Sequence, residues 1–185
     1  MKNSLWIALP SATAAIVAMP AAYAAQYLSV EAAQQQIFGA ARFEPLHLAL
    51  TPAQQQQINA SAIANSNIEP RIWQVREGDK QGEKLAGYFF VHDVIGKQDY
   101  ITYAVALDAE GKVKTVEILA YRESHGFEIR NARWRAQFAG KRASDTVKLD
   151  ADIANISGAT LSCRHVTDGV RRILAIYEAA LKDLR

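Results

Sequence analysis

The alternation of apolar and polar side chains between residues 71 and 121 constrains this chain most, because that pattern suits strands with one buried face. Four segments of this stretch are rich in Val, Ile, Tyr and Phe: Arg71 to Arg76, Leu85 to Asp93, Tyr100 to Leu107 and Val113 to Tyr121. The run from Asp108 to Gly111 has the composition of a turn, with glycine where a left-handed residue is needed. The pattern therefore predicts a small antiparallel sheet whose last two strands form a hairpin.

Helical patterns precede the strands. The segment from Ser29 to Gly39 predicts a short amphipathic helix that stops at the glycine. A second helix is expected to begin at Thr51 and Pro52, with Thr51 as its cap and Gln54 completing a capping box. We therefore expect residues 25–69 to form an N-terminal helical segment.

Further helical patterns follow the strands. A short helix is expected from Arg130 to Phe138 and a long one from about Leu161 to Leu184. Apolar residues recur along the long helix at three- and four-residue steps, which predicts one face that packs on the sheet. Helices outside an antiparallel sheet make the fold class α+β, and residues 70–185 are expected to form one domain.

The first 24 residues have the order of a secretory signal peptide. Lys2 precedes an apolar run from Leu5 to Met19, and the small-residue site Ala22-Tyr23-Ala24 follows it. We expect cleavage after Ala24 and a periplasmic location. The alternative is an uncleaved membrane anchor, because the apolar stretch approaches the roughly 20 residues that span a bilayer, although Pro10 and Pro20 interrupt it.

Charge and cysteine content exclude several classes of protein. Lys and Arg number 21 against 19 Asp and Glu, a balance that argues against a nucleic-acid binder held by a long basic face. Cys163 is the single cysteine, so an internal disulfide, a CxxC redox pair and a cysteine-rich metal cage are excluded. His47, His92 and His125 show no metal-binding spacing, and no metal site is predicted.

The run from Ser157 to Ser162, Ser-Gly-Ala-Thr-Leu-Ser, stands where the long helix is expected to begin. Gly158 allows a sharp turn, and Thr160 and Ser162 add hydroxyl groups. The unpaired N–H groups and positive dipole end of a helix start hold anions, phosphate above all. The residues alone leave open a simpler alternative, in which a Ser or Thr at this place only caps the helix.

The same run resembles the flavinylation motif of the FMN-binding domain family, which occurs in flavin subunits of the sodium-pumping NADH:quinone oxidoreductase and the Rnf complex and in small exported flavoproteins. The resemblance implies FMN joined through its phosphate to the matching threonine, Thr160, by a flavin transferase that uses FAD after export. It implies further phosphate-end contacts from Ser157, Gly158, Ala159, Leu161 and Ser162.

A second segment strengthens the resemblance. Tyr121 to Glu128, followed by Trp134 and Phe138, is similar to the family's stretch in which a Glu and a Gly-containing loop precede a Trp and a Phe. The resemblance implies that four residues of this loop border the flavin ring: Glu123, Ser124, His125 and Gly126. The chain departs from the transferase's pattern at Ala154, where an Asp is usual, although Asp150 and Asp152 are nearby.

Other polar residues near the motif have two interpretations each. Cys163 falls on the apolar face of the long helix, which favours a buried apolar cysteine over a redox-active thiol. Arg164 and His165 could approach the phosphate or ring, or lie on a solvated face. A local basic run could likewise receive an acidic redox partner such as a cytochrome, or be a solvated helix face; it comprises Arg122, Arg130, Arg133, Arg135, Lys141 and Arg142.

The resemblance implies an extracytosolic carrier that relays electrons between a membrane-side donor and a periplasmic acceptor. Its partners would be the flavin transferase and a cytochrome or membrane electron-transfer subunit. The sequence has no G-x-G-x-x-G motif and no Walker loop, so we expect an electron-transfer component without catalytic side chains of its own, not a self-contained reductase. The alternative is a non-redox module that binds a phosphorylated or anionic ligand reversibly.

Overall fold

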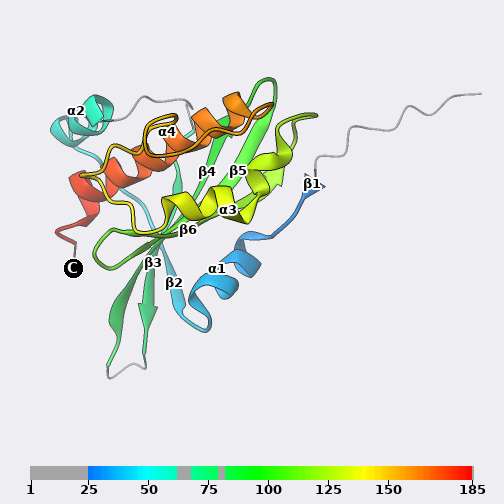
Figure 1. The fold of residues 1–185 in the computed structure, drawn as a ribbon. Helices are drawn as coiled ribbons and strands as arrows, with labels where there is room; N and C mark the ends of the chain where they lie inside the picture. The colour runs from blue at the N-terminus through cyan, green and yellow to red at the C-terminus, as the bar shows by residue number, and fades with distance from the viewer. Residues whose placement is uncertain (1–24, 62–67, 79–81, 185) are drawn as a thin grey trace, which may run out of the picture.

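The computed structural model describes residues 25–61, 68–78 and 82–184. The expected signal peptide, residues 1–24, lies outside the described residues. The described part forms one six-stranded sheet in which every neighbouring pair is antiparallel, in the order β1-β6-β5-β4-β3-β2 (Figure 1). The strands are β1 (Ala25–Gln26), β2 (Arg42–Leu46), β3 (Arg71–Glu77), β4 (Lys84–Ile95), β5 (Tyr100–Asp108) and β6 (Val113–Tyr121).

The four predicted strands are confirmed as β3 to β6. The predicted hairpin between β5 and β6 is also present, since the Asp108 N–H and the Lys112 carbonyl are 2.8 Å apart and Gly111 has a φ of 79°. The sequence patterns do not predict the two edge strands. β1 has only two residues, which is too few to show an alternation. β2 contains Pro45, which has no backbone N–H to donate and argues against a strand in the sequence.

Helices cover the two faces of this sheet unequally, and the α+β prediction is confirmed. The helices are α1 (Val30–Phe38), α2 (Pro52–Ser61), α3 (Ala132–Arg135) and α4 (Thr160–Ile176). Helix α4 is continued by a wider π turn (Tyr177–Leu181), and 3₁₀ turns (Phe127–Arg130 and Ala136–Phe138) flank α3. Figure 1 shows α4 running across one face of the sheet, with α3 on the same side. The predicted short and long helices are thus present.

Two hydrophobic cores lie on the two faces of the sheet, because alternate residues of each strand point to opposite sides. On β4, Phe90 belongs to the larger core under α4, whereas Phe89 and Val91 belong to the smaller core. Helix α1 closes the smaller core with Ala33 and Phe38. The sheet is therefore buried on both sides along its central strands.

The helix starts follow the expected capping chemistry at the N-terminal helices. At α2 the Gln54 N–H donates to Thr51 Oγ1 at 3.3 Å, and the Thr51 N–H donates to Gln54 Oε1 at 2.9 Å. This reciprocal pair is the predicted capping box. At α1 the Ser29 hydroxyl accepts from the Ala32 N–H at 3.1 Å, and the helix ends at Gly39 as predicted.

Gly169 brings the middle of α4 close to the sheet. A Cβ at this position would overlap the buried hydroxyl of Tyr103 on β5. That hydroxyl lies 2.9 Å from His92 Nδ1 on β4, and His92 Nε2 lies 2.9 Å from the carbonyl oxygen of Ile68. Burial lowers the pKa of His92, which keeps the ring neutral within this network.

We predict that Gly169→Ala lowers the free energy of unfolding by about 1–3 kcal/mol, because the added methyl group forces α4 away from the sheet. The cost should exceed the gain of about 1 kcal/mol in helix propensity. Urea unfolding measures the change. In the double variant with Tyr103→Phe the overlapping oxygen is absent, so its loss should be smaller than the sum of the two single losses; additive losses would contradict the close approach.

Candidate functional site

The candidate site lies at one end of the sheet, where β4 and β6 end and α4 begins. Ile101 on β5 is paired with Tyr121, the last residue of β6, and Ile95 is paired with Tyr100 across the β4–β5 turn. His165 in the first turns of α4 lies 2.5 Å from the Ile95 carbonyl oxygen through Nδ1. This contact ties the start of α4 to the end of β4.

The start of α4 has no side-chain cap. Thr160 is the first residue inside the helix, and the capping position is held by Ala159, which has no side-chain acceptor. The starts of α1 and α3, by contrast, are capped by Ser29 and Asn131. The alternative that the motif threonine caps the helix is therefore wrong, and the N–H groups of the first turn remain available to an anion.

The turn before α4 presents the motif to solvent. Gly158 has a φ of 87°, with open space where a side chain would stand, and the Ala159 N–H donates to the Ile156 carbonyl oxygen at 3.0 Å. Asn155 Nδ2 donates to Thr160 Oγ1 at 3.1 Å. Asn155 thus holds the Thr160 oxygen at the N-terminus of α4. No sequence pattern predicted this contact.

Tyr121 joins the two predicted segments of the site. Its hydroxyl donates to the His125 carbonyl oxygen at 2.5 Å and lies 2.9 Å from Ser162 Oγ. A Cβ at Gly126, whose φ is 89°, would come within 2.6 Å of the Tyr121 oxygen. The loop of residues 124–126 is therefore held directly against the first turn of α4, as the predicted site requires.

Glu123 is engaged with the β4–β5 turn. Its carboxylate accepts hydrogen bonds from the backbone N–H groups of Lys97, Gln98 and Asp99, the last at 2.9 Å. Partial burial acts to raise the pKa of Glu123, but these three donors outweigh it and lower the pKa below the usual value of 4.5. The side chain anchors the end of the sheet, and its ionised form is the one that the turn stabilises.

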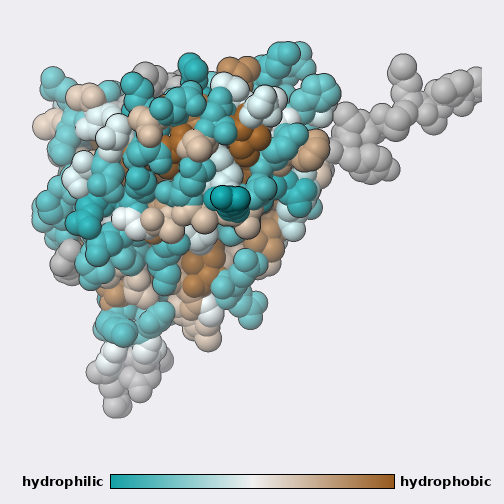
Figure 2. Space-filling view, in the orientation of Figure 1, coloured by the Kyte–Doolittle hydropathy of each residue, from teal (hydrophilic) through white to brown (hydrophobic). Residues whose placement is uncertain are grey.

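Four large apolar side chains are exposed at this end: Ile95, Tyr100, Phe127 and Leu161. They are four of the six exposed large apolar residues in the described part of the chain, and Phe127 is 54% exposed. Ser124 and His125 are also exposed beside them. The space-filling view in Figure 2 shows apolar patches set among polar side chains on the α4 face. Because exposed apolar surface is a feature of many ligand and partner sites, this end of the sheet is the candidate site.

Side-chain hydrogen bonds hold the backbone of the residues before the motif. Trp134 Nε1 donates to the Ala154 carbonyl oxygen at 2.8 Å, and the Ala154 N–H donates to Gln137 Oε1 at 2.8 Å. Asp152 accepts from Lys141 Nζ at 2.8 Å and from the Lys148 N–H at 2.7 Å. Its carboxylate therefore stabilises the turn that precedes the motif.

The thiol of Cys163 is fully buried beneath the site, and burial raises its pKa. This bears out the interpretation of Cys163 as a buried apolar residue, because a reactive thiol needs exposure and a lowered pKa. Ser162 is also buried, and its hydroxyl faces Tyr121. Of the motif hydroxyl groups, those of Ser157 and Thr160 are the more accessible.

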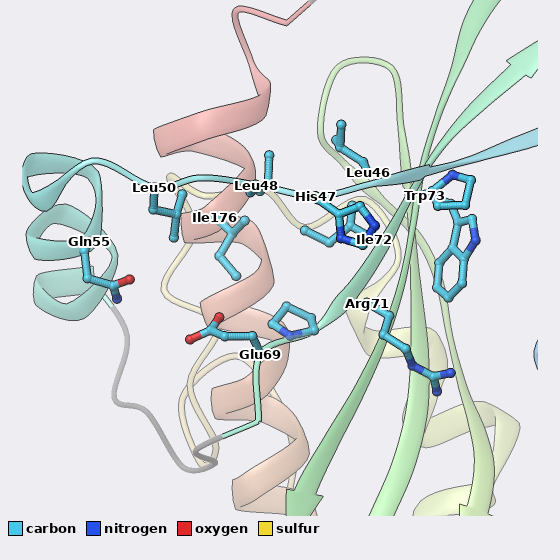
Figure 3. A pocket seen from close by; sticks show the side chains of 12 residues that line it. Leu46, His47, Leu48, Leu50, Gln55, Glu69, Arg71, Ile72, Trp73 and Ile176 are labelled. Carbon is cyan, nitrogen blue, oxygen red and sulfur yellow. The ribbon is translucent and has the colours of Figure 1, made fainter.

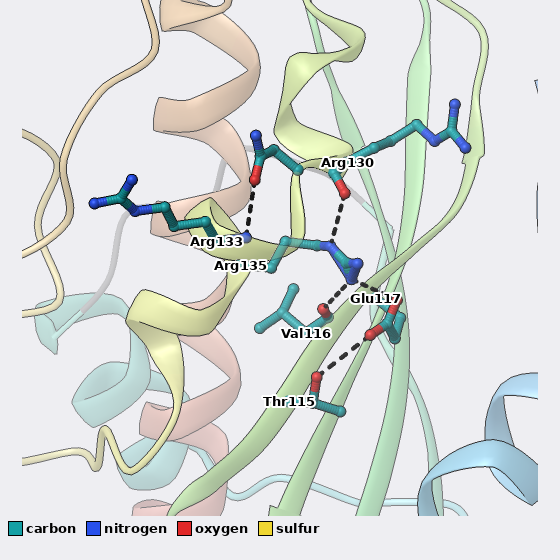
Figure 4. Close-up of polar contacts among 7 residues, drawn as sticks. Thr115, Val116, Glu117, Arg130, Arg133 and Arg135 are labelled. Carbon is teal, nitrogen blue, oxygen red and sulfur yellow. Dashed lines mark hydrogen bonds and ion pairs between the residues drawn. The ribbon is translucent and has the colours of Figure 1, made fainter.

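The basic run does not form one continuous charged face. Arg135 pairs with Glu117 at 2.5 Å and also donates to the carbonyl oxygens of Val116 and Arg130, as Figure 4 shows. The Arg130 guanidinium lies 3.5 Å from the centre of the Tyr27 ring. The side chains of Arg130 and Arg133 point in opposite directions in Figure 4.

The structure is an α+β domain in which the start of α4, at one end of the sheet, has no side-chain cap. Residues 96–175 match the family model of the FMN-binding domain, so this part of the chain belongs to the FMN-binding domain family, and FMN is its cofactor. The match begins in the β4–β5 turn, directly after Ile95, and ends one residue before the end of α4, so it includes the loop after β6 and the motif at the start of α4. No curated protein matches the chain. In the described ranges, no helix is long and apolar enough to cross a membrane.

The residues present fit the phosphate end of FMN. The first turn of α4 offers backbone donors without a side-chain cap, and Thr160 Oγ1 lies in that turn. Sequence reasoning missed Asn155, the clamping role of Tyr121, and the exposed Ile95, Tyr100 and Phe127. Each depends on a contact or exposure created by the fold, and a tyrosine at the end of a strand carries no signal of its own.

We predict that Tyr121→Phe lowers the free energy of unfolding by about 1–3 kcal/mol, because it leaves the buried Ser162 hydroxyl without this partner. Amide hydrogen exchange should also rise in residues 124–127, which lose their link to α4. Tyr27→Phe is the matched control and should leave that exchange unchanged, because the Tyr27 ring lies against Arg130 and its hydroxyl makes no hydrogen bond, within the described residues, to the loop of residues 124–126 or to α4. Unaltered exchange in Tyr121→Phe would contradict the clamp.

The lowered pKa of Glu123 predicts how the free energy of unfolding depends on pH. The ionised carboxylate contributes stability above the usual value of 4.5, and this contribution is lost as the pH falls through the lower folded-state pKa. The stability difference between wild type and Glu123→Gln should therefore be constant near neutral pH and shrink below 4.5. Urea unfolding across that range measures it, and a difference independent of pH would argue against the three N–H contacts.

Proposed function

We propose that this protein is an extracytosolic flavoprotein that carries FMN covalently on Thr160 and relays electrons between a membrane-side donor and a periplasmic acceptor. The proposal starts from the FMN-binding domain over residues 96–175. The observation that carries the attachment point is the position of Thr160 in an uncapped first helical turn, with its oxygen held by Asn155.

The arrangement of hydroxyl groups favours Thr160 over its neighbours. Ser162 is buried and its oxygen lies against Tyr121, whereas Ser157 precedes the turn at Gly158 and lies outside the helix. A phosphate esterified to Thr160 would lie beside the backbone donors and the positive end of the α4 dipole. Those groups would offset its negative charge without requiring a basic side chain.

Attachment requires one transfer step by a separate flavin transferase. The Thr160 oxygen would form a bond to the FMN phosphorus of FAD, the pyrophosphate bond would break, and AMP would leave with the hydroxyl proton released to solvent. Ala154 stands where the family's recognition pattern usually has an aspartate. Its N–H and carbonyl are both held by side chains, so the approach to Thr160 has a fixed backbone shape despite that departure.

When bound, FMN supplies the oxidation–reduction chemistry, and the protein supplies position and electrostatics. The exposed Ile95, Tyr100, Phe127 and Leu161 would cover part of the ring and exclude water from it. His125, which is exposed beside them, would border the ring edge. A cofactor at the surface suits transfer to another protein, and this supports a carrier over a self-contained reductase.

Export and partners complete the proposal. The N-terminal sequence supports secretion. A covalent tether would prevent loss of FMN outside the cytoplasm, where no pool of free flavin replaces it. A cytochrome or a membrane electron-transfer subunit is the proposed redox partner. Arg122 and Arg133 are exposed cations of the basic run that could meet acidic groups on such a partner.

We predict that the protein exported from a host with a flavin transferase gains the mass of FMN less one water. Thr160→Ala should remain unmodified, because its side chain has no oxygen to form the ester. Intact-mass spectrometry measures the gain, and flavin fluorescence that survives denaturation verifies the covalent bond.

Thr160→Ser and Thr146→Ala are the matched controls for this experiment. Thr160→Ser keeps a hydroxyl at the site and should be modified, and Thr146→Ala removes an exposed threonine elsewhere and should be modified fully. If wild type stays unmodified while the same host flavinylates a control protein, the covalent proposal fails. Yellow protein that loses its flavin on denaturation would then indicate reversible FMN binding.

A further inference from the structure

His165 lies in the second turn of α4, and one of its two ring nitrogens is bound to the end of the sheet. Nδ1 lies 2.5 Å from the Ile95 carbonyl oxygen. Because a carbonyl oxygen can only accept a hydrogen bond, Nδ1 carries the proton. In the neutral ring Nε2 then has no hydrogen and can only accept. Within the described part of the chain, Nε2 has no hydrogen-bond partner.

The imidazole of His165 lies over the start of the helix. Side chains of an α-helix lean toward its N-terminus, so the His165 ring covers the turn that contains Leu161. At about 100° per residue, Leu161 lies between Thr160 and His165 around the helix surface. Leu161 is exposed and His165 is half-buried. An exposed apolar side chain therefore separates the proposed attachment oxygen from an unused hydrogen-bond acceptor.

The end of the sheet brings further apolar side chains to the same place. Ile95, whose carbonyl oxygen accepts from His165, is 44% exposed, and its strand partner Tyr100 is 41% exposed. Glu123 holds the turn between them through the N–H groups of residues 97–99. His165 thus connects the exposed apolar residue of α4 with those of the β4–β5 turn.

The chemistry of the flavin ring matches this arrangement. The oxidised ring has a broad apolar body and a polar edge, on which the N–H group at N3 stands between two carbonyl groups. That group is the only N–H donor of the oxidised ring. A histidine nitrogen without a hydrogen is complementary to it, and the exposed apolar side chains are complementary to the body of the ring.

We infer that Nε2 of His165 accepts a hydrogen bond from the N3–H group of bound FMN, while the ring packs on Leu161, Ile95 and Tyr100. The ribityl chain would then span from the phosphate at Thr160 to a ring whose polar edge lies at His165, over a rise of about 7.5 Å along α4. The inference rests on the proposed FMN site, but it does not require the covalent bond.

Free FMN and its N3-methylated analogue test this contact on the exported protein made in a host without a flavin transferase. The methyl group replaces the hydrogen that His165 would accept. Titrations followed by flavin fluorescence should show that wild type binds N3-methyl-FMN about tenfold more weakly than FMN, which corresponds to the loss of one hydrogen bond.

His165→Asn separates the contact with FMN from the contact with the sheet. The amide nitrogen of asparagine can take the place of Nδ1 beside the Ile95 carbonyl, but none of its atoms reaches the place of Nε2. This variant should bind FMN about tenfold more weakly than wild type does, again through the loss of one hydrogen bond. Its preference for FMN over N3-methyl-FMN should fall below twofold.

His47→Asn is the matched control, because His47 lies near the other end of α4. There it lines a separate cavity of about 600 Å³ with Leu48 and Ile176 (Figure 3). Ile176 is about 24 Å along the helix axis from Thr160. The control variant should keep the wild-type affinity and the tenfold preference for FMN.

Several results would overturn the inference. Equal binding of the two flavins by wild type would do so, as would an equal preference in wild type and His165→Asn. If free FMN binds too weakly to titrate, the nitrogen NMR resonance of His165 Nε2 is compared before and after covalent loading, and an unchanged resonance overturns the inference.

Failure of covalent attachment is distinguishable from failure of this contact. Thr160→Ala should gain no mass in a host with the transferase, yet it should keep the preference for FMN over N3-methyl-FMN. Covalently loaded wild type with an unchanged Nε2 resonance would overturn the contact alone. A protein that holds FMN in neither form would overturn both the contact and the proposed function.

Discussion

The close approach of α4 to the sheet at Gly169 is the constraint on which the rest of the arrangement depends. A side chain at that position would overlap the Tyr103 hydroxyl, so the helix can lie this near only because glycine has no Cβ. The Tyr103 hydroxyl is in turn held by buried His92. With the middle of α4 fixed and His165 bound to the end of β4, the first turn of the helix must face the end of the sheet.

That placement forms the candidate site at the end of the sheet. The sheet end gathers three segments that are distant in sequence: the β4–β5 turn, the loop after β6 and the start of α4. Glu123 holds the first to the second, and Tyr121 holds the second to the third. These contacts hold the loops in place through polar side chains. The apolar side chains at this end are therefore not needed to pack the loops, and four of them are exposed.

The sequence predicts what depends on local periodicity and local hydrogen bonding. Strands β3 to β6, the hairpin at Gly111, the capping box at Thr51 and the burial of Cys163 follow from such signals. The edge strand β2 does not, because pairing of Phe43 with Val75 joins residues separated by a helix and a loop. The uncapped start of α4 was equally hidden, since a threonine at the first helical position and one at the cap differ by a single residue.

A cavity of about 600 Å³ beside Leu46, Leu48 and Ile176 could not be predicted from the sequence for the same physical reason. Its walls come from the edge strand, from α2 and from the last turn of α4, and no pattern in any one segment indicates a hollow between them. The candidate site differs from this cavity, because it is built around backbone donors and exposed loops, whereas the cavity is lined mainly by apolar side chains. One chain thus presents two different kinds of surface at opposite ends of α4, one suited to a charged phosphate and one to an apolar body.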